Sequence, residues 1–202
     1  MIAAGNAPAA DYAGRVILVV DHRDSFTYNL VQLIERLGHP TEVVATDAEP
    51  AEALAARRPD AVVLSPGPGS PAGAAVFLDL LAALPADTPV LGVCLGHQAL
   101  GVAAGAPVVR GEPVHGHASP VFHDGRGIFE GIPVPFDAAR YHSLRVRRED
   151  LPPEIEVTAW TEDDVVMGLA RRDRPWFGVQ FHPESILTPE GPRIVGNFLA
   201  LA

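Results

Sequence analysis

The only cysteine of the chain, Cys94, lies in the segment Gly92-Val93-Cys94-Leu95-Gly96, between an apolar run and a stretch with helical spacing. This is the pattern of a nucleophile elbow, a sharp strand-to-helix turn that lifts one reactive side chain out of a sheet. The flanking glycines fit a turn that leaves no room for neighbouring side chains. A helix N-terminus also favours the thiolate form of a cysteine. The segment therefore indicates nucleophilic catalysis, the alternative being a buried structural cysteine.

A thiol nucleophile needs a base, and the base needs a group that orients it. His182 follows the apolar run 176–181, so we expect it at the end of a strand. Glu184 comes two residues later, and side chains at positions i and i+2 of an extended segment point the same way. Pro183 favours an extended backbone between them. We therefore expect Glu184 to orient His182, and His182 to serve Cys94.

Other histidines of the chain are weaker candidates for chemistry. His97 comes three residues after Cys94, and we expect it to pack or line the site rather than act as the base. His115 and His117 form a His-x-His pair with His123 nearby, which is one way to begin a metal site. No second cluster of cysteine or carboxylate ligands accompanies them, so we expect no metal.

A loop rich in glycine and proline covers residues 65–69 (Ser-Pro-Gly-Pro-Gly). Such a loop after a strand could cradle a phosphate. However, Ala72 stands where a third glycine is expected, and the chain has no lysine for a Walker motif. Proline also removes the amide donors that a phosphate nest needs. A rigid loop with one exposed amide is better suited to stabilising an oxyanion.

The elements that must position these residues alternate between strand and helix over the first 105 residues. Strands are expected at 15–20, 41–45, 61–64 and 89–93, and helices at about 26–37, 50–58, 74–84 and 95–104. This alternation predicts an α/β fold with an open, doubly wound, mostly parallel sheet and helices on both faces. Ligands of such sheets bind at the carboxyl ends of the strands. Residues 21–25, the loop at 65–71 and Cys94 are all expected there.

The second half predicts a smaller antiparallel β region and one last helix. Short apolar pieces are separated by turns, without a long helix between them. The expected strands cover 118–122, 136–139, 144–147, 154–160, 165–170 and 176–180, and the helix covers about 189–201.

Length and composition place the chain among ordinary globular proteins. Its 202 residues, 48% hydrophobic and 20% charged, predict a single domain over residues 15–202 after a flexible lead over residues 1–14 without a signal-peptide pattern. The net charge is −10, so neither nucleic acid nor an anionic membrane is an expected partner. No apolar run reaches the roughly 20 residues of a membrane span. A lone cysteine fits a reducing cytoplasm, the expected location.

Five motifs together resemble the class I, triad-type glutamine amidotransferases. The chain looks most similar to the glutaminase subunits of anthranilate synthase and aminodeoxychorismate synthase. The motifs occur in the family's order and spacing over nearly the whole chain. They are Asp21 with 24–30 (Asp-Ser-Phe-Thr-Tyr-Asn-Leu), 64–69 (Leu-Ser-Pro-Gly-Pro-Gly), 92–98 (Gly-Val-Cys-Leu-Gly-His-Gln), 140–144 (Arg-Tyr-His-Ser-Leu) and 178–185 (Gly-Val-Gln-Phe-His-Pro-Glu-Ser).

The resemblance implies a role for each motif. Cys94 would attack the side-chain amide of L-glutamine, His182 would transfer the proton to the departing ammonia, and Glu184 would orient His182. The remaining roles are an oxyanion hole formed by the amides of Gly67 and Leu95, and glutamine binding by Gly69, Gln98, Ser143 and Leu144. No cofactor is needed for this half-reaction. Ammonia would pass to a separate chorismate-binding synthase subunit, in a heterodimer or larger complex.

The chain departs from the family pattern in two places. Neither involves Cys94, His182 or Glu184, and both are expected to face the partner subunit. His22-Arg23 stands where the family usually has Asn-Tyr, and His117 stands where lysine is common. The first expected product is 4-amino-4-deoxychorismate, on the para-aminobenzoate and folate branch. The alternatives are component II of anthranilate synthase, on the tryptophan branch, a free-standing cysteine hydrolase of γ-glutamyl substrates, and a non-enzymatic module that has kept the fold.

Overall fold

The computed structural model describes residues 16–202, so the lead predicted over residues 1–14 lies outside the described residues. Nine strands of the described part form one sheet in the order β2-β1-β3-β4-β9-β8-β7-β5-β6. They are β1 (Ile17–Asp21), β2 (Thr41–Ala45), β3 (Ala61–Leu64), β4 (Val90–Val93), β5 (Val108–His123), β6 (Phe136–Val146), β7 (Ile155–Trp160), β8 (Val166–Arg171) and β9 (Trp176–Val179). The α-helices are α1 (Thr27–Arg36), α2 (Ala51–Ala56), α3 (Ala75–Ala83), α4 (Leu95–Ala103) and α5 (Gly191–Leu199).

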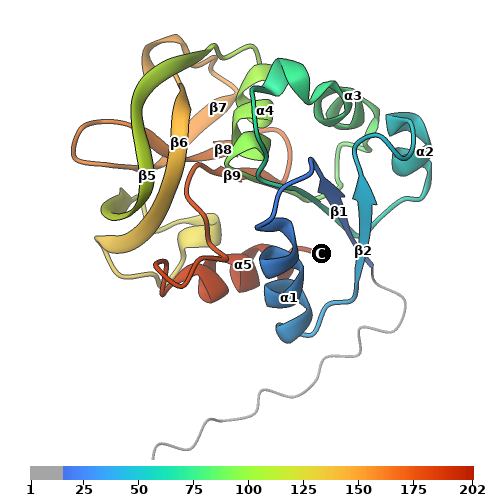
Figure 1. Cartoon of the computed structure of the whole chain (residues 1–202), viewed down its shortest axis with the longest axis horizontal. Helices are drawn as coiled ribbons and strands as arrows, with labels where there is room; N and C mark the ends of the chain where they lie inside the picture. Colours follow the sequence, from blue (N-terminus) through green and yellow to red (C-terminus); the bar gives the residue numbers. More distant parts are fainter. Residues whose placement is uncertain (1–15) are drawn as a thin grey trace, which may run out of the picture.

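The first half confirms the expected doubly wound arrangement. Strands β2, β1, β3, β4 and β9 are parallel neighbours. Alternate residues of β1 point to opposite faces of the sheet, so that Ile17 and Val19 join one buried cluster and Leu18 and Val20 join another. Helices α1 and α5 cover the first face, and α2, α3 and α4 cover the second (Figure 1). Burial on both faces explains why β1, β3 and β4 are continuous apolar runs, unlike the edge strand β2.

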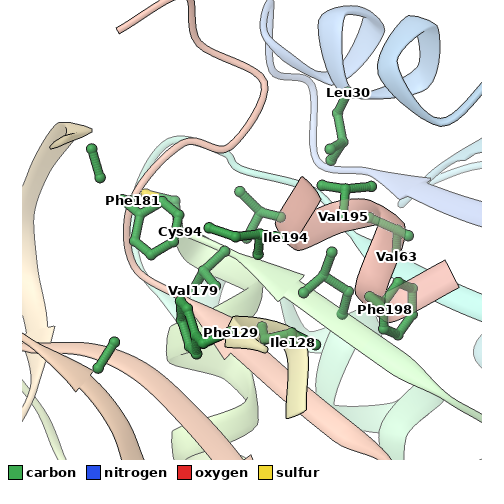
Figure 2. Packing of buried hydrophobic residues seen from close by; sticks show 14 of the residues in the cluster. Leu30, Val63, Cys94, Ile128, Phe129, Val179, Phe181, Ile194, Val195 and Phe198 are labelled. Carbon is green, nitrogen blue, oxygen red and sulfur yellow. The ribbon is translucent and has the colours of Figure 1, made fainter. Parts of the chain in front are cut away.

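The cluster beneath α1 and α5 reaches the end of β4, where Cys94 lies (Figure 2). Phe181 and Ile194 are fully buried in this cluster, and Figure 2 shows Phe181 beside Cys94. The ring of Phe181 packs against Phe129 and Phe136 from the second half of the chain. Cys94 is therefore part of a close-packed core, and this packing restricts the motion of its side chain.

The second half is mostly antiparallel, as expected, except that β9, predicted as one of its antiparallel strands, pairs with β8 in antiparallel and with β4 in parallel and so completes the parallel part of the sheet. Two further strands differ in length from the prediction. Strand β5 is 16 residues long, and the piece predicted at 118–122 is only part of its last third. The pieces predicted at 136–139 and 144–147 belong to one strand, β6, of 11 residues. Bulges between Arg110 and Val114 and between His115 and His117 let β5 keep pairing with β6 across glycine, proline and histidine. These strands form the long curved ribbons of Figure 1.

The loops at the carboxyl ends of the parallel strands are brought together, as expected. Cys94 occupies the turn between β4 and α4, and the loop at 65–70 follows β3. His182 follows β9, which ends at Val179, one residue earlier than predicted. Among residues 16–202, no helix is both long and apolar enough to cross a membrane.

Candidate active site

The turn at Cys94 has the geometry of a nucleophile elbow. Cys94 has a φ of 51° and a ψ of −97°, a conformation that a residue with a side chain rarely adopts. Its backbone N–H donates to the carbonyl of Val179 at 2.8 Å, which ties the turn to β9. A Cβ atom on Gly92 would lie 2.5 Å from the carbonyl oxygen of Gly96, and one on Gly96 would lie 2.4 Å from that of Leu64. Both flanking glycines are therefore required by close backbone contacts.

His182 and Glu184 form the expected pair after β9, but the segment between them is not extended as predicted: residues 183–184 form a turn, in which the N–H of Ser185 donates to the carbonyl of His182 at 3.2 Å. The Nδ1 atom of His182 lies 2.6 Å from Oε1 of Glu184, and both side chains are buried. The backbone of His182 is held by a donated hydrogen bond to Ala139 on β6 at 3.0 Å. The hydroxyl of Thr188 donates to the carbonyl of His182 at 2.7 Å and accepts from the N–H of Ala139 at 2.9 Å. Thr188 thus fastens the loop that carries His182 to β6.

The environment of His182 favours its charged form. Burial opposes the charge, but the interactions with Cys94 and Glu184 outweigh burial and raise the pKa of His182 to about 10. The rings of Tyr141 and Phe26 contact the imidazole edge-on, at centroid distances of 5.1 and 5.4 Å. At neutral pH the site therefore holds an imidazolium beside the sulfur. Since Nδ1 faces Glu184, Nε2 is the nitrogen available for proton transfer.

A cavity of about 180 Å³ opens in front of Cys94. It is lined by the backbone and side chains of three segments, namely Gly67-Pro68-Gly69, Cys94-Leu95 with Gln98, and Tyr141-His142-Ser143-Leu144, together with His115. All residues predicted for the oxyanion hole and for glutamine binding are therefore gathered in one place with Cys94. His182 and Glu184 are absent from this lining, and both are almost completely buried.

The amide side chain of Gln98 is fixed on the wall of this cavity. Its Nε2 donates to the carbonyl of Leu144 at 3.1 Å and to Oε1 of Gln180 at 3.2 Å. Gln180 in turn places its Nε2 3.7 Å from the sulfur of Cys94. Gln180 lies inside the motif at 178–185, directly before Phe181 and His182, but spacing gave no sign that its side chain would reach the nucleophile.

The structure also gives places to the other histidines. His97 is fully buried against Gly178, and burial lowers its pKa to about 3, so it packs beneath the site as a neutral side chain. His142 lines the cavity, and burial together with the charge of Arg140 lowers its pKa to about 4. His115 lines the cavity as well. Over residues 16–202, no three potential ligands are grouped closely enough to hold a metal ion.

The fold and the site together combine an α/β architecture with a cysteine on a strained strand-to-helix turn, a histidine–carboxylate pair and a small cavity beside the cysteine. The family model described as glutamine amidotransferase class-I matches residues 18–202. The chain therefore belongs to the class-I glutamine amidotransferase family and is a glutamine amidotransferase.

Relatives with known names are similar over most of the chain. Anthranilate synthase component 2 of Azospirillum brasilense is 48% identical over 186 residues, which cover 91% of this chain and 95% of the relative. Anthranilate synthase component 2 of Mycobacterium tuberculosis is 51% identical over 188 residues, covering 91% and 81%. Aminodeoxychorismate synthase of Streptomyces griseus is 52% identical over 190 residues, which cover 90% of this chain and 25% of that longer protein.

A solved structure shares the fold. It is described as a GMP synthase protein of Thermoplasma acidophilum, with a TM-score of 0.83, 26% sequence identity and 93% coverage of both chains. The comparison supports the α/β architecture expected from the alternation of strands and helices.

Proposed function

We propose that this chain is the glutaminase subunit of a chorismate-aminating synthase, in which residues 15–202 form a single domain. The observation that carries the proposal is the cavity that joins Cys94 to Gly67, Leu95 and Gln98. Ammonia released there is delivered to a separate chorismate-binding subunit. The names of the relatives, each a component or form of anthranilate or aminodeoxychorismate synthase, support this partner.

The first half of the proposed reaction forms a thioester. Cys94 attacks as the thiolate, which is the nucleophilic form of cysteine, while the imidazole of His182, whose pKa is raised, holds the proton. The sulfur adds to the side-chain carbonyl of glutamine, and the amides of Gly67 and Leu95 stabilise the oxyanion. When the C–N bond breaks, the Nε2 proton of His182 passes to the departing nitrogen and ammonia is released.

The second half hydrolyses the thioester. His182, now neutral, takes a proton from water, and the resulting hydroxide adds to the thioester carbonyl. The C–S bond then breaks, glutamate leaves, and the thiolate and imidazolium are restored. Glu184 keeps Nε2 directed at the reacting atoms during both halves through its hydrogen bond to Nδ1. The balance is glutamine and water giving glutamate and ammonia.

Which product the synthase makes is the finer part of the proposal. The number of relatives named anthranilate synthase component 2 favours anthranilate, which the sequence alone ranked second. The 52% identity to the aminodeoxychorismate synthase of Streptomyces griseus favours 4-amino-4-deoxychorismate. We propose anthranilate as the product and keep 4-amino-4-deoxychorismate as the second candidate.

A test combines this chain with the chorismate-binding subunit of the same organism, chorismate and glutamine, and identifies the product by mass spectrometry. We expect anthranilate. In the same assay, Cys94→Ala should abolish the glutamine-dependent reaction and leave the reaction with added ammonium salts intact. Glutaminase activity that survives in Cys94→Ala would refute the proposal. Strong turnover by the isolated chain, unchanged by the partner, would favour a free-standing γ-glutamyl hydrolase.

A further inference from the structure

Gln180 is a buried polar residue to which the proposed reaction gives no role. It follows the last residue of β9 and has no exposed surface. Its backbone N–H donates to the carbonyl of Met167 at 2.9 Å, so its side chain is not needed to complete the sheet. That side chain bridges the sulfur of Cys94, 3.7 Å from Nε2, and Nε2 of Gln98, 3.2 Å from Oε1. A long polar side chain buried here needs an explanation beyond packing.

The neighbours determine which end of the Gln180 amide faces the sulfur. Gln98 presents its NH₂ group to the carbonyl of Leu144, which can only accept a hydrogen bond. The same NH₂ group faces Gln180, so Gln180 must turn its oxygen toward Gln98. Its own NH₂ group is therefore directed at Cys94. The reverse orientation of the Gln180 amide would place its NH₂ group against the NH₂ group of Gln98 and its oxygen against the sulfur.

The contacts of Arg140 and His142 determine the other hydrogen bond at the carbonyl of Leu144, the acceptor on which the orientation of both amides depends. The Nε of Arg140, which can only donate, lies 3.3 Å from Nε2 of His142. Nε2 of His142 must therefore accept, and Nδ1 carries the proton and donates to the carbonyl of Leu144 at 3.1 Å. The low pKa of His142 agrees with this neutral form. The direction of each hydrogen bond from Arg140 to the sulfur is thus defined.

We propose that Gln180 is a catalytic residue whose amide N–H stabilises the thiolate of Cys94 and links it to Gln98, the residue expected to bind glutamine. The inference rests on the proposed role of Cys94 as the nucleophile. A hydrogen bond to a charged acceptor in a buried site is stronger than one to a neutral acceptor, so it favours the thiolate over the thiol. Gln180 therefore acts on the sulfur from the side of β9, and His182 acts through its imidazolium.

Alkylation of Cys94 tests this inference without the partner or chorismate. Cys94 is the only cysteine, so the rate of iodoacetamide modification, followed by mass spectrometry, reports one thiolate. We compare the wild-type chain with Gln180→Met, which keeps a similar volume but has no donor. We expect the midpoint of the pH profile to rise by about one unit, and the rate below the midpoint to fall about tenfold. For glutamine hydrolysis, kcat should fall more than KM rises.

A control and a second variant complete the experiment. Thr158→Val removes a buried hydroxyl on β7 that lies outside the cavity lining, and its alkylation profile should match the wild type. Gln98→Met keeps the donor of Gln180 but releases its anchor, and should raise the midpoint by a smaller amount. A folded Gln180→Met with the wild-type profile overturns the inference. If that variant does not fold, an unchanged profile in Gln98→Met overturns it. Neither result affects the product assay that tests the proposed function.

Discussion

At the scale of single residues, the groups expected to handle the transferred proton differ from those expected to stabilise the negative charges. Glu184 contacts the imidazole of His182 but does not line the cavity, so it acts through that imidazole. The backbone amides of Gly67 and Leu95 are expected to meet the oxyanion, and Gln180 meets the sulfur. Each reacting group therefore has its own partner.

Glu184→Gln should narrow the pH range of the reaction. Glu184 is one of the groups that raise the pKa of His182 to about 10, so its removal lowers that pKa and moves the alkaline limb of kcat/KM to lower pH. We expect kcat at neutral pH to fall by about 10²-fold, within the range that a positioned proton donor contributes. The measurement is glutamate release across pH. Glu52→Gln, on the surface of α2, should leave the profile unchanged.

At the scale of elements, the position of the sulfur depends on how closely β3, β4 and α4 approach one another. Gly96 lies in the first turn of α4 and against the carbonyl of Leu64 at the end of β3. Because the contact is between backbone atoms, a side chain there cannot be accommodated by a change of rotamer. The elbow therefore links catalysis directly to the packing of the sheet.

Gly96→Ala should destabilise the fold and reduce activity together. The added Cβ would lie 2.4 Å from the Leu64 carbonyl, so α4 must move. We expect a loss of about 1–3 kcal/mol in the free energy of unfolding, as for other forced overpacking in cores. Urea denaturation and glutaminase assays measure the two effects. Gly73→Ala, which has open space around the added atom, is the control. Equal stability of the two variants would contradict this prediction.

The sequence predicted the parallel elements well and the antiparallel pair poorly, for a physical reason. Strands buried on both faces are uninterrupted apolar runs, as at 61–64, where the strand has the predicted bounds; the edge strand at 41–45, although partly exposed, also has the predicted bounds. Strand β5 is largely exposed and contains glycine, proline and histidine, and β6 is interrupted by the polar residues 140–143, so neither reads as one continuous strand. For the same reason residues 140–143 gave no sign of lying within a strand.

The candidate site could be predicted where a motif carries its own geometry. The spacing of Cys94 between glycines describes a local turn, which is present as expected. His182 and Glu184 are paired as expected, although they meet across a turn rather than along the predicted extended segment. The contact of Gln180 with Cys94 joins positions 86 residues apart, and no local pattern encodes it. Tyr141 and His142 likewise line the cavity because β6 lies against the loop after β9, where His182 donates a backbone hydrogen bond to Ala139.

At the scale of the whole molecule, two buried histidines make the fold sensitive to acid. The pKa of His97 is lowered to about 3 and that of His142 to about 4, whereas in the unfolded chain both titrate near 6.5. Between these values protons bind the unfolded state preferentially, so stability is present above pH 6.5 and is lost as the pH falls. By pH 5 the loss for His97 is about 2 kcal/mol.

Urea denaturation at pH 7 and pH 5 measures this acid sensitivity. His182 does not cancel the loss, because its raised pKa adds stability that is complete below pH 6.5 and declines steadily as the pH rises from 6.5 to about 10. His97→Gln should show a smaller drop between the two pH values than the wild type. His117→Gln, an exposed position, should show the same drop as the wild type. A drop of equal size in His97→Gln would rule out His97 as a source of the acid sensitivity.

The positive φ of Cys94 implies that the protein has a lower free energy of unfolding than it would have with glycine at this position. A strained backbone of this kind costs about 1–3 kcal/mol, and glycine would adopt the same torsion without that cost. Cys94→Gly should therefore have a higher Tm than both the wild type and Cys94→Ala, although it has no nucleophile. Selection for stability alone would replace Cys94 with glycine. Because Cys94 is retained, interactions elsewhere in the core must compensate for its backbone strain.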